Sequence, residues 1–148
     1  MNIQKEPNWF SNFIYYNIPL TYKNISYTSP EHFYQAMKTT DPVIRQSIAN
    51  SNTGGKAKRL GRKISIRSDW DDITIQVMTV AIAHRKHDNS WIDKLISTND
   101  EIVEWNYWHD NYWGNCICDK CLDIKGLNNL GRIIMNLRTE INMRICVY

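Results

Sequence analysis

The segment TSPEHFYQAMK, residues 28–38, holds the first group of residues whose types and spacing could carry out chemistry. Glu31 is followed by Gln35 four residues later and by Lys38 seven residues later. On an α-helix these positions share one face, so a carboxylate, an amide and an ammonium group would converge. The positive end of the helix dipole would keep the carboxylate ionised, and such a group can orient or deprotonate a water molecule. Alternatively, Glu31 only favours the start of the helix.

A second carboxylate, Asp110, stands in the aromatic segment WHDNYWG, three residues before Trp113. This segment has neither helical nor strand periodicity. Aromatic rings that carry an N–H or O–H group suit the walls of half-wet pockets, where Asp110 could bind the hydroxyl groups of a ligand. The alternative is a small aromatic core under a loop, in which Asp110 caps a turn.

Cationic side chains are concentrated in the segment GGKAKRLGRKISIR, which contains no acidic residue. The basic residues of this segment are Lys56, Lys58, Arg59, Arg62, Lys63 and Arg67. They predict a surface that attracts an anion, and a phosphate group explains it as well as a polymer does. The net charge of +3, from 18 basic and 15 acidic residues, is too small to indicate a nucleic-acid-binding protein by itself.

The segment GLNNLGR, residues 126–132, opens the last helix that the sequence predicts. Exposed N–H groups at a helix N-terminus bind anions, and glycine lets a ligand approach the backbone closely. A phosphate or carbonyl group could therefore bind near Asn128. A glycine in front of a helix is more often only the start of that helix.

Three cysteines, Cys116, Cys118 and Cys121, have a spacing that is typical of metal sites. Three thiolates need a fourth ligand to complete a tetrahedral zinc site, and the candidates are His109, His32 and Cys146. The alternative is a set of reduced, partly buried thiols. The order of cysteine and histidine residues does not indicate a catalytic cysteine. We expect no cofactor and assign no metal to the predicted catalytic site.

The elements that must position these residues are mainly helical. Residues 13–27 are rich in β-branched and aromatic side chains around Asn17, Ile18 and Pro19, which predicts two short strands with a turn. A further short strand is expected over residues 101–105. Ser29 and Pro30 are typical of a helix start, as are Asp41 and Pro42. One helix is expected to begin at residue 30, and others to cover residues 42–49, 69–87, 91–96 and 126–144. A further helix is expected from the end of the loop 52–55 to about residue 61.

Apolar periodicity predicts the buried faces of the two longest helices. In the first of them the predicted stripe consists of Trp70, Ile73, Val77, Ala81 and His84, with Met78 and Ile82 beside it. In the last helix the stripe consists of Leu127, Leu130, Ile134, Leu137 and Ile141.

The length of 148 residues predicts a single domain, residues 1–148. Hydrophobic residues make up 43% and charged residues 22%, which is ordinary for a globular protein. We expect a mainly α fold, at the border of the α+β class, with a small antiparallel β element near the N-terminus. The N-terminal sequence lacks a signal-peptide pattern, and no apolar run approaches the roughly 20 residues of a membrane span, so we expect a cytoplasmic protein.

Several collinear segments together resemble the NADAR family, also called YbiA-like. They are NWFSNF, YTSPEHFYQAMK, AKRLGRKISIRSDWD, the helix that contains Met78, DNYWG and GLNNLGRIIMNLR, and they extend from Trp9 to Arg138. The resemblance implies a mainly helical single-domain fold and cleavage of N-glycosidic bonds. The sequence departs from the family's pattern at two places. Lys86 is followed by His87, Asp88 and Asn89, and a cysteine-rich insert lies between Gly114 and Gly126.

The resemblance also implies a substrate class. YbiA-like members act on the first intermediates of riboflavin biosynthesis, which are ribosylamino-pyrimidine phosphates, so the expected substrate is a small ribose phosphate. Other similar proteins are ADP-ribosyl glycohydrolases, which remove ADP-ribose from modified bases, nucleic acid or protein. A third alternative is a non-catalytic module that binds ADP-ribose or nucleic acid.

Carried over onto this sequence, the family's key residues fall on Glu31, Gln35, Lys38, Trp70, Asp110 and Asn128. We expect Glu31 and Asp110 to be catalytic. Trp70 would stack on the flat heterocycle, and Trp113 would line the pocket. The expected phosphate ligands are Lys38, Arg59, Arg62 and Arg67.

Overall fold

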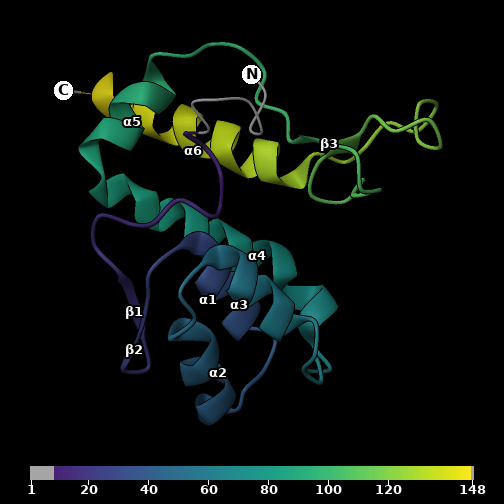
Figure 1. The fold of residues 1–148 in the computed structure, drawn as a ribbon. Helices are drawn as coiled ribbons and strands as arrows, with labels where there is room; N and C mark the ends of the chain where they lie inside the picture. The colour runs from purple at the N-terminus through teal and green to yellow at the C-terminus, as the bar shows by residue number, and fades with distance from the viewer. Residues whose placement is uncertain (1–8, 148) are drawn as a thin grey trace. The chain divides into compact units, whose positions relative to one another are not determined.

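The computed structural model describes residues 9–147, which fold into two compact units (Figure 1). One unit contains residues 12–89, and the other contains the described residues 9–11 and 90–147. Residues 1–8 lie outside the described residues, and they include Asn8 of the NWFSNF segment and most of the N-terminal sequence used for the predicted location. The single domain over residues 1–148 stays a prediction.

The first unit begins with an antiparallel hairpin of β1 (Leu20–Tyr22) and β2 (Ile25–Tyr27). The two predicted strands are confirmed, but the turn lies at Lys23 and Asn24 rather than at residues 17–19. Both turn residues have positive φ angles, 47° and 63°. A two-residue hairpin turn with this backbone matches the twist of the strands, and asparagine adopts it readily.

Three short helices follow, and each starts at a side chain that caps its N-terminus. In α1 (Pro30–Ala36) the Ser29 side chain accepts from the backbone N–H of the third residue, as the sequence predicts. Asp41 does the same for α2 (Pro42–Ala49), whose predicted bounds are confirmed. Ser and Asp are favoured here because their side-chain oxygens satisfy N–H groups that lack partners within the helix.

The third helix, α3 (Gly54–Gly61), is capped by Thr53, whose hydroxyl accepts from the N–H of Lys56 at 3.1 Å. The two glycines predicted to lie in a loop form the first turn of this helix. Because the cap lies at Thr53, the predicted loop is shorter and the helix begins earlier.

The long predicted helix is confirmed as α4 (Trp70–Ala83), which continues into a 3₁₀ turn, η1 (His84–His87). Its buried face differs from the predicted stripe. The buried residues are Trp70, Thr74, Met78, Ala81 and Ile82, whereas Ile73, Val77 and His84 are half-buried. Thr74 was not predicted to be buried, and its hydroxyl lies 3.4 Å from that of Tyr34. A polar partner on α1 thus compensates for burying it.

Helix α1 is the centre of this unit, because it contacts α2, α3 and α4 and all of its residues are buried (Figure 1). Such a helix has no face turned to water. Polar side chains on α1 therefore need partners inside the protein or in a ligand.

The other unit contains two helices, α5 (Asn89–Ile96) and α6 (Asn129–Ile145), of which α5 belongs to it from the second residue on. Between them lies a parallel pair of short strands, β3 (Trp105–Asn106) and β4 (Asn115–Cys116). Helix α6 begins after Asn128, whose backbone is left-handed with φ 51°. Leu127 precedes this bend and is 50% exposed, so its predicted burial is wrong.

The fold is mainly α, with the small antiparallel sheet near the N-terminus that the sequence predicts. Within residues 9–147 we find no helix with the length and apolar character needed to cross a membrane.

Candidate active site

Glu31 lies in the first turn of α1 and is only 6% exposed. Its backbone N–H donates to the carbonyl oxygen of Asn12 at 3.1 Å. Its side-chain Oε1 accepts a hydrogen bond of 2.7 Å from Nε2 of Gln35, which is 2% exposed. The carboxyl group is therefore held in one orientation by its neighbour on the same helix face, as the spacing predicts.

Burial raises the pKa of the Glu31 carboxyl, because a charge is less stable away from water. The hydrogen bond from Gln35 lowers the pKa, and so do the positive charges of Lys58, Lys38 and Arg62, in that order. The net rise is opposite to the effect expected from the helix dipole alone. Desolvation dominates here, and the carboxyl group holds its proton to higher pH than an exposed glutamate does.

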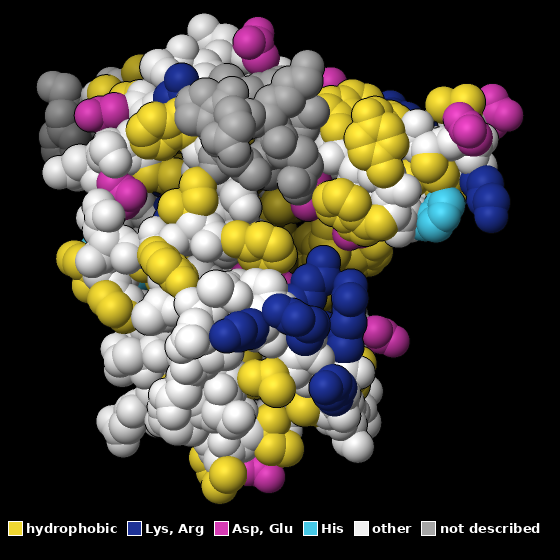
Figure 2. Space-filling view, viewed as in Figure 1, with side chains coloured by type: hydrophobic (Ala, Val, Ile, Leu, Met, Phe, Trp, Pro, Cys, Tyr) yellow, Lys and Arg dark blue, Asp and Glu magenta, His cyan; other side chains and the backbone are white. Residues whose placement is uncertain are grey.

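The three cations that act on Glu31 come from the end of α1 and from α3. Lys38 follows α1 and is half-buried, with its Nζ 5.3 Å from the centre of the Tyr34 ring. Burial lowers the pKa of Lys38, and the charge of Glu31 opposes this change. On this face of the protein Lys and Arg side chains gather beside α3 (Figure 2). A buried acid thus adjoins a cationic surface.

Two buried amide oxygens in this unit have no hydrogen-bond partner within the described part of the chain: Oε1 of Gln35 and Oδ1 of Asn12. Both residues are bonded to Glu31, one through its side chain and the other through its backbone. Buried acceptors are rarely left unpaired. A water molecule or the donor groups of a ligand would satisfy them.

Lys58 was not among the phosphate ligands predicted from the sequence, whereas Arg59 and Arg67 were. Lys58 and Arg62 are four residues apart and share one face of α3 and its C-terminal turn, whereas Arg59 lies about 100° around the helix from Lys58. The helical spacing could have shown this difference. Arg59 is exposed.

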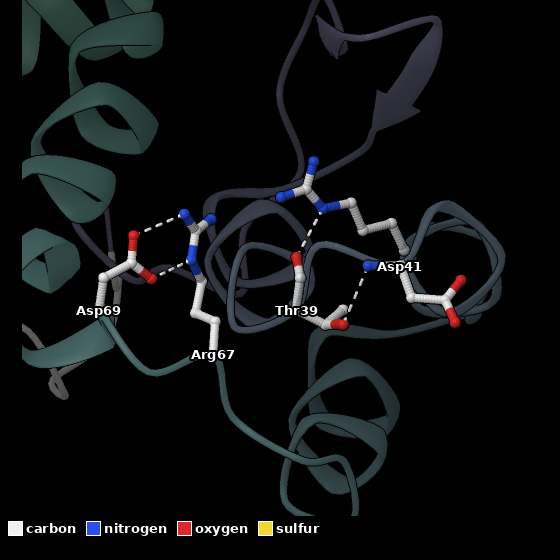
Figure 3. A network of polar contacts seen from close by, with 5 residues as sticks. Thr39, Asp41, Arg67 and Asp69 are labelled. Carbon is white, nitrogen blue, oxygen red and sulfur yellow. Dashed lines mark hydrogen bonds and ion pairs between the residues drawn. The ribbon is translucent and has the colours of Figure 1, made fainter.

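Arg67 is held by a carboxylate rather than turned toward a ligand. Its Nε and Nη2 atoms donate to the two carboxylate oxygens of Asp69 at 2.5 and 2.8 Å (Figure 3). Such a forked pair uses the geometry with which arginine would bind a phosphate. The role of Arg67 in binding substrate stays a prediction that this contact does not favour.

Trp70 is 8% exposed and its ring packs on Tyr34, with the ring centres 5.2 Å apart and the planes 59° apart. Because Tyr34 belongs to α1, this contact joins the start of α4 to the helix that carries Glu31. Little of the indole surface is open, so stacking on a heterocycle stays a prediction.

Asp110 caps a turn in the second unit. Its Oδ1 accepts from the backbone N–H groups of Tyr112 at 3.0 Å and Trp113 at 2.8 Å. Its own N–H donates to Oδ1 of Asn106 at 3.1 Å. The structural alternative for Asp110 is therefore observed, and its catalytic role stays a prediction. Trp113 is half-buried, with its ring edge-on to that of Tyr112 at 5.0 Å.

The predicted anion site at the start of the last helix stays a prediction that the observed contacts do not favour. The backbone N–H groups of residues 127–130 already donate to the carbonyl oxygens of residues 111–114, at 2.8 to 3.3 Å. The amide of Asn128 is also occupied, since it donates to Ile102 O at 2.8 Å and accepts from Glu104 N–H at 3.0 Å. These contacts give Asn128 a structural role, and its role in binding substrate stays a prediction.

The structure thus brings together Glu31, Gln35, Lys38 and Arg62 in the first unit, with Lys58 added. Asp110, Trp113 and Asn128 belong to the second unit. A depression on α2 is lined by Pro42, Val43, Gln46, Ser47 and Asn50, and it includes none of the predicted site residues.

The mainly helical fold of this chain is of the YbiA type. The fold is similar to the NMR structure of YbiA from Escherichia coli, with a TM-score of 0.80, 26% identity, and coverage of all of this chain and 88% of that chain. Residues 2–142 match the family model of the NADAR domain, and the chain belongs to this family.

Similar proteins include an N-glycosidase of Nostoc punctiforme, 33% identical over 89% of this chain and 84% of the relative. The N-glycosidase YbiA of Escherichia coli K12 is 29% identical over 89% of this chain and 80% of the relative. A riboflavin biosynthesis protein of Vibrio vulnificus is 29% identical over 95% of this chain. This chain spans 40% of that relative's length.

Proposed function

We propose that this protein is an N-glycosidase that hydrolyses ribosylamino-pyrimidine phosphates, the intermediates of riboflavin biosynthesis. The observation that carries the proposal is the burial of the Glu31 carboxyl against Gln35, among the charges of Lys38, Lys58 and Arg62. The names of the relatives, N-glycosidase and riboflavin biosynthesis protein, support the reaction and the substrate class.

The reaction breaks the bond between C1 of the ribose and the nitrogen of the base, and it forms a bond between C1 and a water oxygen. The electron pair of the broken bond stays on the nitrogen, which takes up one proton, while the water loses one. Positive charge builds up on C1 and the ring oxygen in the transition state. The enzyme must therefore move a proton and stabilise a cation.

Glu31 is suited to the proton transfer because burial raises the pKa of its carboxyl above the usual range. A carboxyl with a raised pKa is a better candidate for giving a proton to the leaving nitrogen than an exposed one. In its ionised form Glu31 also stabilises the positive charge on the sugar. Gln35 keeps the carboxyl oriented through the hydrogen bond from its side-chain N–H group.

The cations near Glu31 are the proposed phosphate ligands. Lys38 and Arg62 are retained from the sequence prediction, and Lys58 is added on the basis of its effect on the Glu31 carboxyl. A guanidinium group can bind two phosphate oxygens at once. Arg59 and Arg67 are less favoured as phosphate ligands, because Arg59 lies on another face of α3 and Arg67 is paired with Asp69.

We also propose that Asp110 binds the ribose hydroxyls and that Trp113 lines the pocket, as the family resemblance implies. Trp70 is proposed to stack on the base, with whatever surface its contact with Tyr34 leaves open.

The decisive experiment incubates the purified protein with the ribosylamino-pyrimidine phosphate and, separately, with ADP-ribosylated DNA and ADP-ribosylated protein. Mass spectrometry then identifies the products. We expect free pyrimidine and ribose phosphate from the first substrate, and no product from the Glu31→Gln variant. Release of ADP-ribose alone would replace the proposal with the ADP-ribosyl glycohydrolase, and binding without any product would replace it with the binding module. A cytoplasmic location remains part of the proposal, to be tested by cell fractionation.

A further inference from the structure

Four side chains with metal-binding atoms converge in the second unit. Nδ1 of His109 lies 3.2 Å from Sγ of Cys118 and 3.4 Å from Sγ of Cys121. The fourth side chain is that of Cys116, and the four ligand atoms all lie within 4.8 Å of one another. In a tetrahedral zinc site with three sulfur ligands and one nitrogen ligand, the donor atoms are roughly 3.5 to 3.8 Å apart. The observed cluster needs only small side-chain movements to reach that geometry.

The backbone positions these side chains for binding. His109 has a left-handed backbone with φ 66°, an uncommon conformation for a residue other than glycine. Its N–H donates to Sγ of Cys116 at 3.3 Å, and the N–H of Cys116 donates to Oδ1 of Asn111 at 2.8 Å. An N–H group that points at sulfur stabilises the thiolate form, which is the form that binds metal.

The surroundings differ from those of ordinary buried thiols. Cys116 and Cys121 are buried, and Cys118 is half-buried, but all three sulfur atoms face one another and the imidazole. Thiols that act as small hydrophobic groups would instead pack among apolar side chains. All four cysteines are free, so no disulfide accounts for the arrangement.

The segment that carries the cluster has little regular secondary structure. Between residues 107 and 128 the only helix or strand is the two-residue β4, and Tyr107, Trp108, Leu122 and Ile124 are exposed by half or more. In Figure 1 this segment is the long loop that extends from β3. A loop of this length without its own core gains order from a metal ion that joins its two arms.

We propose that His109, Cys116, Cys118 and Cys121 bind a structural Zn²⁺ ion through Nδ1 and three thiolate sulfurs. Four protein ligands complete the tetrahedron and leave no position for a water or substrate, so the ion holds the loop and takes no part in catalysis. The three thiols lose their protons to solvent when the metal binds. His109, one of three candidates for the fourth ligand, completes the set. Asp110 directly follows it, so the ion would also fix the turn that Asp110 caps.

The test measures the zinc content of the full chain, purified without chelator and dialysed against metal-free buffer, by plasma mass spectrometry. We expect one zinc ion per chain in the wild type and its loss in Cys118→Ser. Cys146→Ser is the matched control, because Cys146 is exposed at the end of α6 and lies outside the cluster. That variant should retain one zinc ion per chain. Wild-type protein without zinc, or equal zinc in all three proteins, would overturn the proposal.

A second measurement does not depend on a variant that folds. The wild type is stripped with a strong chelator under reducing conditions, and its melting temperature is measured before and after one equivalent of Zn²⁺ is returned. We expect a fall and a recovery for the wild type and for Cys146→Ser. The His109→Ala variant tests the one exposed ligand of the proposed site. This variant should lose zinc more readily than the wild type during dialysis. An unchanged melting temperature after the zinc has been removed would rule out a structural ion.

Discussion

Gly61 of α3 lies so close to Gln35 of α1 that a Cβ atom at residue 61 would stand 2.0 Å from Oε1 of Gln35. The same atom would lie 2.9 Å from Cδ and 3.0 Å from Cβ of Gln35. The glycine therefore allows α3 to approach α1, and with it the cations of α3 to approach Glu31. Because Gln35 donates to Glu31, the space left by Gly61 also determines how the carboxyl is held.

Replacing Gly61 with alanine should consequently destabilise the protein and lower its activity together. Forcing a methyl group into a filled space costs about 1 to 3 kcal/mol, and the displaced Gln35 would no longer orient Glu31. Gly55→Ala is the matched control on the same helix, because its Cβ would meet only Oγ1 of Thr53 at 3.8 Å. That change should be neutral, or stabilising by up to about 1 kcal/mol. Thermal unfolding and the turnover rate measure both effects, and equal stability of the two variants would contradict the prediction.

Glu31→Gln should abolish most of the turnover while the protein stays folded and binds its substrate. Gln preserves the shape of the side chain and can still accept the hydrogen bond from Gln35, but it cannot transfer a proton. The expected fall in kcat is about 10² to 10⁴-fold, the usual contribution of general acid and base catalysis. Glu140→Gln, which removes an exposed carboxylate paired with Arg144 on α6, is the control and should retain full activity. Full turnover in the Glu31 variant would exclude the proposed mechanism.

The local features of this fold could be predicted from the sequence because they depend on neighbouring residues. Ser29 and Asp41 cap helices through hydrogen bonds to N–H groups two or three residues later, and Glu31 meets Gln35 one helical turn away. The resemblance to a family added the function, through several collinear segments that no single motif could replace.

Features that depend on tertiary contacts could not be predicted. The close approach of Gly61 to Gln35 joins two helices, and Thr74 is buried because Tyr34 lies across from it. The N–H groups of residues 127–130 at the start of α6 already have acceptors, because residues 111–114 lie against them. Among the candidate fourth ligands for the cysteines, only the loop conformation selects His109.

The pH dependence of stability should reveal the buried carboxyl. Burial raises the pKa of Glu31 from its ordinary value of 4.5, so the folded protein favours the protonated form more than the unfolded chain does. This contribution is fully present below pH 4.5 and is lost as the pH rises through the raised pKa. Unfolding by denaturant from pH 4.5 upward should therefore show Glu31→Gln gaining stability relative to the wild type. A constant difference across this range would mean that the carboxyl is not desolvated.

The roles of the cations can be separated by comparing Arg62 with Arg67. Arg62 is free to bind the phosphate in the proposed site, so Arg62→Ala should raise KM for the phosphorylated substrate about tenfold or more, as expected for a hydrogen bond between charged groups worth about 1.5 to 3 kcal/mol. Arg67 is already paired with both carboxylate oxygens of Asp69, so Arg67→Ala should change KM much less. Steady-state kinetics with the phosphorylated substrate and with its dephosphorylated form measure these changes in KM. The effect of Arg62→Ala should vanish when the phosphate is absent. A larger effect at Arg67 would place the phosphate beside Asp69 rather than beside Glu31.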